Sequence, residues 1–195
     1  MQVREIIDTY YPEYSWYGEY PADQCAPFNK ASEKWGVLGN FGHTAITLDG
    51  VVFQNSEQLF HMMKFRSPEA LHDIHSAKGL LIKRKAKKWE RMGLCREDWP
   101  QMLVDALKFC LMQKYSQSEL FRETLKESRG RYIVEDQSSF TKAADTYGAK
   151  LSGDGTSYSG PNLMGRLLME LRENGKLEYS LPGDITSFAD LRKAV

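Results

Sequence analysis

The sequence contains few cysteines, no long apolar run and no excess of either charge, and each shortage excludes a class of protein. The three cysteines, Cys25, Cys95 and Cys110, are odd in number and form no Cys-x-x-Cys pair, which argues against a disulfide framework and a structural zinc site. Lys and Arg together number 26, as do Asp and Glu, so no net charge draws the chain onto nucleic acid or a membrane. We therefore expect any nucleic-acid contact to be local.

Membranes and metals are also not expected as partners. No apolar stretch approaches the about 20 residues that a membrane span needs. The first residues, MQVREIIDTYYPEY, lack the apolar centre of a signal peptide, so a cytoplasmic location is expected. His72 and His75 lie three residues apart without a further Cys or His nearby, so we expect no metal and no cofactor.

The length and the periodicity predict a mainly α-helical, α+β protein with a single compact domain and a few short strands. A chain of 195 residues with 42% hydrophobic residues can bury a sizeable core. Three segments are expected, namely an aromatic extension over residues 1–27 packed on the domain or its cleft, a catalytic domain over 28–175, and a tail over 176–195 ending in a short helix. Helices are predicted from Asn55 or Ser56, from Ser67, over 80–92, over 100–114, from Ser116 with a capping box to Glu119, and from Pro161 to Asn174.

The stretch Leu48–Phe65, LDGVVFQNSEQLFHMMKF, carries the strongest indication of function. It predicts a strand and turn followed by a buried helix, with Asn55 or Ser56 as the cap and Gln58 in a capping-box position. Glu57 falls in the first turn, where the helix dipole favours an ionised carboxylate. It is either an ordinary first-turn residue or a catalytic carboxylate, and this segment alone does not decide.

Other segments supply candidate contacts to a phosphate or to a flat ring. The helix over 80–92 is the one dense basic run, and it is either a solvated face or a surface that attracts phosphates. The polar connection over 136–160 is long enough to carry function, and the helix that follows Pro161 begins with N–H groups that suit anions. The aromatic extension either wraps the domain or lines a cleft.

The order and spacing of several short motifs resemble the NADAR family, also called YbiA-like. The resemblance runs from about Phe28 to Arg172 and rests on these elements: Leu38–Phe41, Leu48–Phe65, Ala77-Lys78, the basic helix with Trp89, Lys108-Phe109, Asp145-x-Tyr147-Gly148 and Gly160-x-Asn162-x-x-Gly165-x-x-Leu168-Met169-x-x-Arg172. One motif departs from the family, which often has Asp-x-x-Trp-Gly where this chain has the shorter Asp145-Thr146-Tyr147-Gly148.

The resemblance implies a compact, mainly helical N-glycosidase that needs no metal. It implies two kinds of substrate, ADP-ribose attached to guanine in DNA or in a nucleotide, and the phosphoribosylated pyrimidine intermediates of riboflavin synthesis. Single-stranded DNA is a further candidate partner. Carried over by motif, Glu57 corresponds to the glutamate of the family's EhaF element, and we expect Asp145 to be a second catalytic acid. The expected substrate-binding residues are Lys30, Asn40, Phe41, Lys64, Lys78, Arg84, Trp89, Tyr147, Gly148, Asn162 and Gly165.

Among these options the sequence favours hydrolysis of ADP-ribosylated guanine, because the basic helix suits a substrate with several charges. A carboxylate near the anomeric carbon stabilises the cation that forms there or activates the attacking water. The rival interpretation is a module that binds ADP-ribose or NAD without catalysis. A plain nucleic-acid binder is a third, which the zero net charge disfavours.

Overall fold

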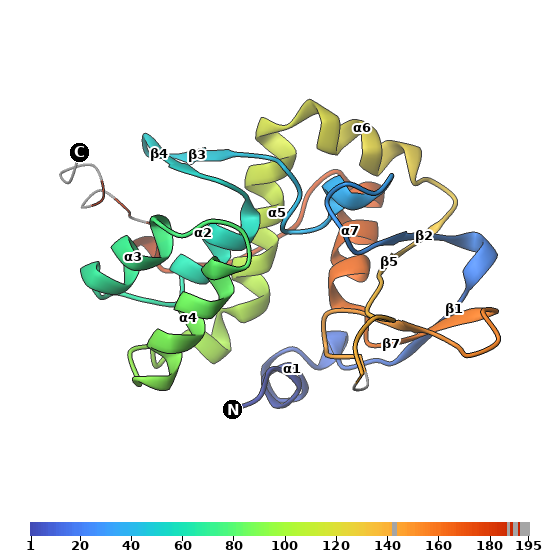
Figure 1. The fold of residues 1–195 in the computed structure, drawn as a ribbon, viewed down its shortest axis with the longest axis horizontal. Coiled ribbons are helices and arrows are strands. Elements are labelled where there is room, and N and C mark those ends of the chain that lie inside the picture. The colour runs from blue at the N-terminus through green and yellow to red at the C-terminus, as the bar shows by residue number, and fades with distance from the viewer. Residues whose placement is uncertain (142–143, 187, 189–190, 192–195) are drawn as a thin grey trace. The chain divides into compact units, whose positions relative to one another are not determined.

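The computed structural model describes residues 1–141, 144–186, 188 and 191, which fall into two compact units (Figure 1). The first unit comprises Met1–Gly42 and Glu119–Leu177, and the second comprises His43–Ser118 and Glu178–Val195. The chain therefore passes from the first unit to the second at His43, returns to the first at Glu119 and enters the second again at Glu178. The division into an extension, a catalytic domain and a tail stays a prediction.

The first unit contains two small sheets. Strands β1 (Gly18–Pro21), β7 (Ser157–Gly160) and β6 (Lys150–Leu151) form an antiparallel sheet in the order β1-β7-β6. Strands β2 (Cys25–Phe28) and β5 (Tyr132–Glu135) pair in parallel, so that Cys25 lies beside Tyr132. Because β1 and most of β2 lie within the predicted extension, residues 18–27 are integral to the sheets of this unit.

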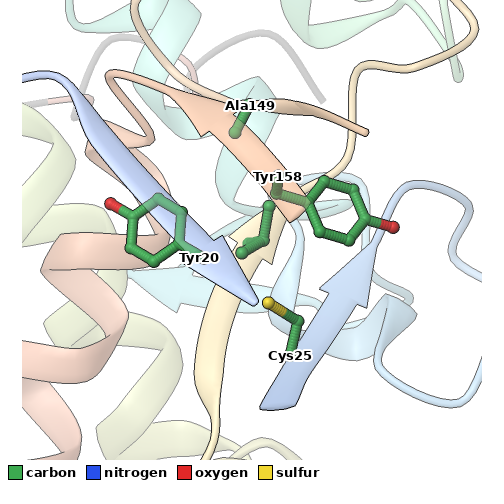
Figure 2. Close-up of a cluster of buried hydrophobic side chains, with 5 residues drawn as sticks. Tyr20, Cys25, Ala149 and Tyr158 are labelled. Atoms are coloured by element: carbon green, nitrogen blue, oxygen red, sulfur yellow. The ribbon is translucent and has the colours of Figure 1, made fainter. Parts of the chain in front are cut away.

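A cluster of buried side chains joins the two sheets (Figure 2). Tyr20 of β1, Tyr158 of β7 and Ala149 come from the antiparallel sheet or next to it, and Cys25 and Val134 come from the parallel pair. Burial of this apolar area stabilises the N-terminal segment on the unit. The aromatic residues of this segment differ in burial: Tyr11, Tyr14 and Tyr20 are buried, whereas Trp16 and Tyr17 are exposed.

Three α-helices belong to the first unit: α1 (Val3–Tyr10), α6 (Glu119–Glu127) and α7 (Leu163–Asn174). Helix α7 packs on β5, and Gly175 ends it in the left-handed conformation that the Asn-Gly pair predicts. Gly165 allows the close approach, because a Cβ atom there would lie 2.1 Å from the backbone oxygen of Ile133.

Among the described residues of His43–Ser118, the second unit contains a hairpin followed by four α-helices. Strands β3 (Ile46–Leu48) and β4 (Val51–Phe53) are joined by Asp49 and Gly50, both at positive φ, which confirms the predicted turn. The helices are α2 (Ser56–Met62), α3 (Pro68–His75), α4 (Leu81–Arg91) and α5 (Leu103–Gln117). Every residue of α2 is buried, and this helix packs on α3, α4 and α5.

Several local predictions were wrong. The helix predicted from Pro100 begins at Leu103, after a 3₁₀ turn over Trp99–Gln101. Ser116 does not cap a new helix, because α5 continues to Gln117 and the Ser116 hydroxyl donates to the carbonyl of Gln113. The segment over 136–160, predicted as a long polar connection, contains the strands β6 and β7.

Further 3₁₀ turns occupy Pro12–Tyr14, Ala22–Gln24, Gly36–Leu38 and Gly183–Thr186. The short helix predicted at the C-terminal end falls largely on positions outside the described residues. Helices and short strands together make an α+β protein. Within the described parts of the chain, every helix is too short or too polar to cross a bilayer.

Candidate active site

Glu57 lies in the first turn of α2, and local hydrogen bonds fix the start of that helix. The Asn55 side chain accepts from the backbone N–H of Gln58 at 3.0 Å, which confirms Asn55 as the cap. The Gln58 oxygen accepts from the N–H of Gln54 at 2.8 Å, one residue before the position that a capping box uses. The amide nitrogen of Gln58 donates to carbonyls at the end of α3, which ties the two helices together.

Two basic side chains hold the carboxylate of Glu57. Its Oε1 lies 3.0 Å from Nε2 of His61, one turn later on α2, and 3.1 Å from Nζ of Lys83 on α4. The Glu57 side chain is 7% exposed, and that of Lys83 is 53% exposed. Glu57 therefore holds a nearly buried charge whose partner reaches solvent.

The pKa values of this group follow from burial and from these contacts. Burial alone would raise the pKa of Glu57, but the contacts to His61 and Lys83 outweigh it and lower the pKa to about 2. Burial, aided by the charge of Lys64, lowers the pKa of His61. A neutral imidazole still donates through its Nε2–H, so Lys83 supplies the positive charge at the carboxylate. Glu57 is thus ionised at neutral pH, as a first-turn position predicts.

The other predicted residues of the second unit lie on or beside α2, α3 and α4. Lys64 forms an ion pair with Glu90 of α4 at 2.7 Å. The indole nitrogen of Trp89 donates to Asp73 of α3 at 2.9 Å. Lys78 and Arg84 are exposed, next to α4 and on it. The basic helix is therefore partly engaged in ion pairs and partly open to solvent.

Asp145 belongs to the first unit, in a loop that its own carboxylate helps to order. Its Oδ1 accepts from the Gln137 side chain at 2.5 Å and from the N–H of Tyr147 at 2.9 Å. Its backbone N–H donates back to Gln137 at 2.8 Å. Asp145 is exposed and Tyr147 is half-buried. Their roles as second acid and stacking surface stay predictions.

The start of α7 does not offer the free N–H groups that the sequence predicts. The N–H groups of Asn162, Leu163 and Met164 donate to the carbonyls of Gly148, Thr146 and Tyr147. The fully buried Asn162 side chain donates to Ile133 and accepts from Glu135 of β5. These bonds position the start of the helix. The carbonyls of residues 146–148 accept from the N–H groups that an anion would otherwise bind.

The remaining predicted residues of the first unit are spread over loops and close contacts. A Cβ atom at Gly148 would meet the Glu135 carbonyl at 2.5 Å, so this glycine, like Gly165, permits close packing. The Asn40 amide lies 3.7 Å from the sulfur of Met164, Phe41 is half-buried and Lys30 is exposed. Their contact with a substrate stays a prediction.

The structure brings Glu57 together with two residues that the predicted site omits, His61 and Lys83. The spacing of four residues between Glu57 and His61 indicates their contact in any helix. The sequence does not indicate that Lys83 contacts Glu57. Which lysine of the basic run reaches the carboxylate depends on how α4 packs on α2. Within the described ranges, no three His, Cys, Asp or Glu side chains gather as metal ligands.

Comparison with known proteins assigns the chain to a family. The NADAR domain family model matches residues 27–174. The chain belongs to the NADAR family. The match begins after most of the aromatic N-terminal segment and contains Glu57, His61, Lys83 and Asp145.

Two named proteins and one solved structure are similar to this chain at low sequence identity. N-glycosidase YbiA of Escherichia coli (strain K12) is 26% identical over 156 residues, which cover 80% of this chain and 91% of YbiA. A riboflavin biosynthesis protein of Vibrio vulnificus is 25% identical over 170 residues, or 85% of this chain, and the matched part is 42% of that longer protein. The NMR structure of Escherichia coli YbiA superposes with a TM-score of 0.61 at 25% identity, covering 78% of this chain and 84% of YbiA.

Proposed function

We propose that this NADAR protein is an N-glycosidase that hydrolyses the bond between ADP-ribose and guanine, with Glu57 as the catalytic carboxylate. The observation that carries the proposal is the ionised, nearly buried Glu57 at the start of α2, held by His61 and Lys83. Membership of the family and the name of YbiA as an N-glycosidase support the class of reaction.

The chemistry requires a negative charge at the sugar. When the C1′–N bond breaks, its electron pair leaves with the base, which takes up a proton, and C1′ becomes cationic. Glu57 stabilises that cation or takes the proton of the water whose oxygen bonds to C1′. Because water reaches little of this carboxylate, its electrostatic effect is less screened than that of an exposed one.

The choice of ADP-ribosylated guanine rests on the charge of the second unit. Lys78, Arg84 and Lys87 remain exposed on or beside α4 after the ion pairs with Glu57 and Asp73 are formed. Exposed cations suit a substrate with two phosphates. The second candidate substrate is a phosphoribosylated pyrimidine intermediate of riboflavin synthesis, which the name of the Vibrio relative favours.

The test compares two first-turn glutamates, Glu57 of α2 and the exposed Glu69 of α3. We expect Glu57→Gln to lower the turnover of ADP-ribosylated guanosine by at least about a hundredfold, because it removes the charge but keeps the shape. Glu69→Gln is expected to retain wild-type turnover. Circular dichroism and thermal unfolding confirm that both variants fold.

Near wild-type turnover by folded Glu57→Gln would overturn the assignment. Parallel assays of wild-type protein on the two substrates identify the preferred one. If calorimetry shows tight ADP-ribose binding and neither substrate yields product, the protein is a binding module and the proposed reaction is wrong.

A further inference from the structure

The first unit contains a pocket of about 360 Å³ that the proposed reaction does not use. Four aromatic side chains line it together with Arg166 and Glu170: Tyr14, Trp16, Tyr20 and Tyr132. Three of them precede residue 27, where the family match begins. The N-terminal segment of this chain therefore supplies three of the seven lining residues, and the rest of the first unit, Met169 included, supplies the other four.

Arg166 is fixed in the wall of the pocket. Its guanidinium carbon lies 5.0 Å from the centre of the Trp16 ring and 5.4 Å from that of Tyr14. Two of its N–H groups donate to the backbone carbonyls of Tyr14 and Glu13, at 3.0 and 2.9 Å. The guanidinium of Arg166 thus lies against the rings on which a cationic ligand would otherwise bind. Its positive charge repels a cationic ligand and favours a neutral or anionic one.

Glu170 supplies a hydrogen-bond acceptor beside these rings. Its Oε2 accepts from the hydroxyl of Tyr14 at 2.8 Å. Burial, reinforced by this hydrogen bond, raises the pKa of Tyr14, so the phenol remains a donor at neutral pH. A carboxylate held through one oxygen keeps lone pairs for the N–H groups of a ligand.

The aromatic rings that line the pocket differ in their exposure to solvent. Trp16 and Tyr132 are 54% and 42% exposed, while Tyr20 between them is buried. Tyr20 makes an edge contact to Trp16, with ring centres 6.2 Å apart, and a tilted contact to Tyr132, with ring centres 5.5 Å apart. Figure 2 shows the Tyr20 hydroxyl pointing away from the buried cluster. The buried ring thus supports two exposed rings on which a flat ligand can stack.

We propose that this pocket binds a guanine base. Stacking on Trp16 and Tyr132 is open to any base, since every base has a π-face. Guanine presents two adjacent N–H donors on its Watson–Crick edge, N1–H and N2–H, which match the two oxygens of a carboxylate. Adenine presents one donor there, its N6 amino group, next to the acceptor N1, which a carboxylate repels. The guanine comes from a free nucleotide or from single-stranded nucleic acid. The inference does not rest on the proposed hydrolysis.

The test measures binding of the full chain by calorimetry to four probes: GMP, AMP, a nine-nucleotide thymidine oligomer, and the same oligomer with a central guanine. We expect Trp16→Ala to weaken binding of both guanine probes by about tenfold or more, the usual effect of losing one stacking partner. Tyr17→Ala is the matched control, because Tyr17 is a neighbouring aromatic residue, 65% exposed, outside the pocket lining.

A second variant keeps the shape of the pocket. Glu170→Gln can still accept from Tyr14, and we expect it to remove the preference for GMP over AMP. Tighter binding of the guanine oligomer than of GMP identifies nucleic acid as the source, and the reverse identifies a nucleotide. Glu57→Gln is expected to bind GMP like wild type, which separates this site from the proposed active site.

Three results would overturn the inference: equal affinities of Trp16→Ala and Tyr17→Ala for GMP, an undiminished guanine preference in Glu170→Gln, or no binding of either guanine probe by wild type at millimolar concentration. None of these results bears on the hydrolysis assigned to Glu57.

Discussion

Glu57 holds a negative charge where water reaches little of it, and the cost of that burial is offset by side chains from two helices. His61 donates from the same helix, and Lys83 brings a full positive charge from α4. A lone carboxylate in such a place would take up a proton near neutral pH, so the ionised state of Glu57 on which the proposed activity depends is maintained by His61 and Lys83.

The contribution of Lys83 can be measured through the pH dependence of stability. The pKa of Glu57 is about 2 in the folded chain against 4.5 ordinarily, so its stabilisation is complete above pH 4.5 and is lost as the pH falls toward 2. We expect Lys83→Met to lower the free energy of unfolding at pH 7 by about 1–2 kcal/mol, less than for a fully buried pair.

That difference should shrink as the pH falls from 4.5 toward 2, because a protonated Glu57 gains nothing from Lys83. Urea unfolding at several pH values checks it. Lys87→Met, which removes an exposed lysine of the same helix, should show no such pH dependence. A constant difference between Lys83→Met and wild type would contradict the pairing.

Helix α7 illustrates how far local sequence determines an element. The sequence predicts this helix and its end at Asn174-Gly175 correctly, because both depend on neighbouring residues, although the helix begins at Leu163 and not at Pro161. The occupied N–H groups at its start could not be predicted, because the carbonyls that use them come from residues 146–148. The same limit explains why the sequence indicates Glu57 and its pairing with His61 but not Lys83, which depends on how two helices pack.

Gly165 gives a direct test of the packing of α7 on β5. In Gly165→Ala the new methyl group would meet the Ile133 carbonyl, and the helix must move away from the strand. We expect the free energy of unfolding to fall by roughly 1–3 kcal/mol or more, as in other overpacked interiors. Gly153→Ala is the control, since a Cβ there has no neighbour within 4 Å among the described residues. Equal stabilities of the two variants in urea would contradict the close contact.

The chain as a whole is electrically neutral, and this balance constrains how it finds a charged substrate. With 26 basic and 26 acidic residues there is no long-range attraction to add to the local cations of α4. A protein that depended on many phosphate contacts would lose affinity by about 10³–10⁵ between about 50 and about 200 mM salt. Lys78, Arg84 and Lys87 are the exposed cations of the second unit to which the proposal assigns such contacts.

We therefore expect kcat/KM for ADP-ribosylated guanosine to fall by less than about tenfold over that range of salt, because one or two local contacts release few counterions. Steady-state rates at several salt concentrations check this. Arg84→Gln should flatten the dependence further by removing an exposed cation of α4, while Arg129→Gln, on an exposed turn of the other unit, should leave it unchanged. A steep decline that survives Arg84→Gln would mean that the substrate is held by an extended basic surface elsewhere, and the role given to α4 would be wrong.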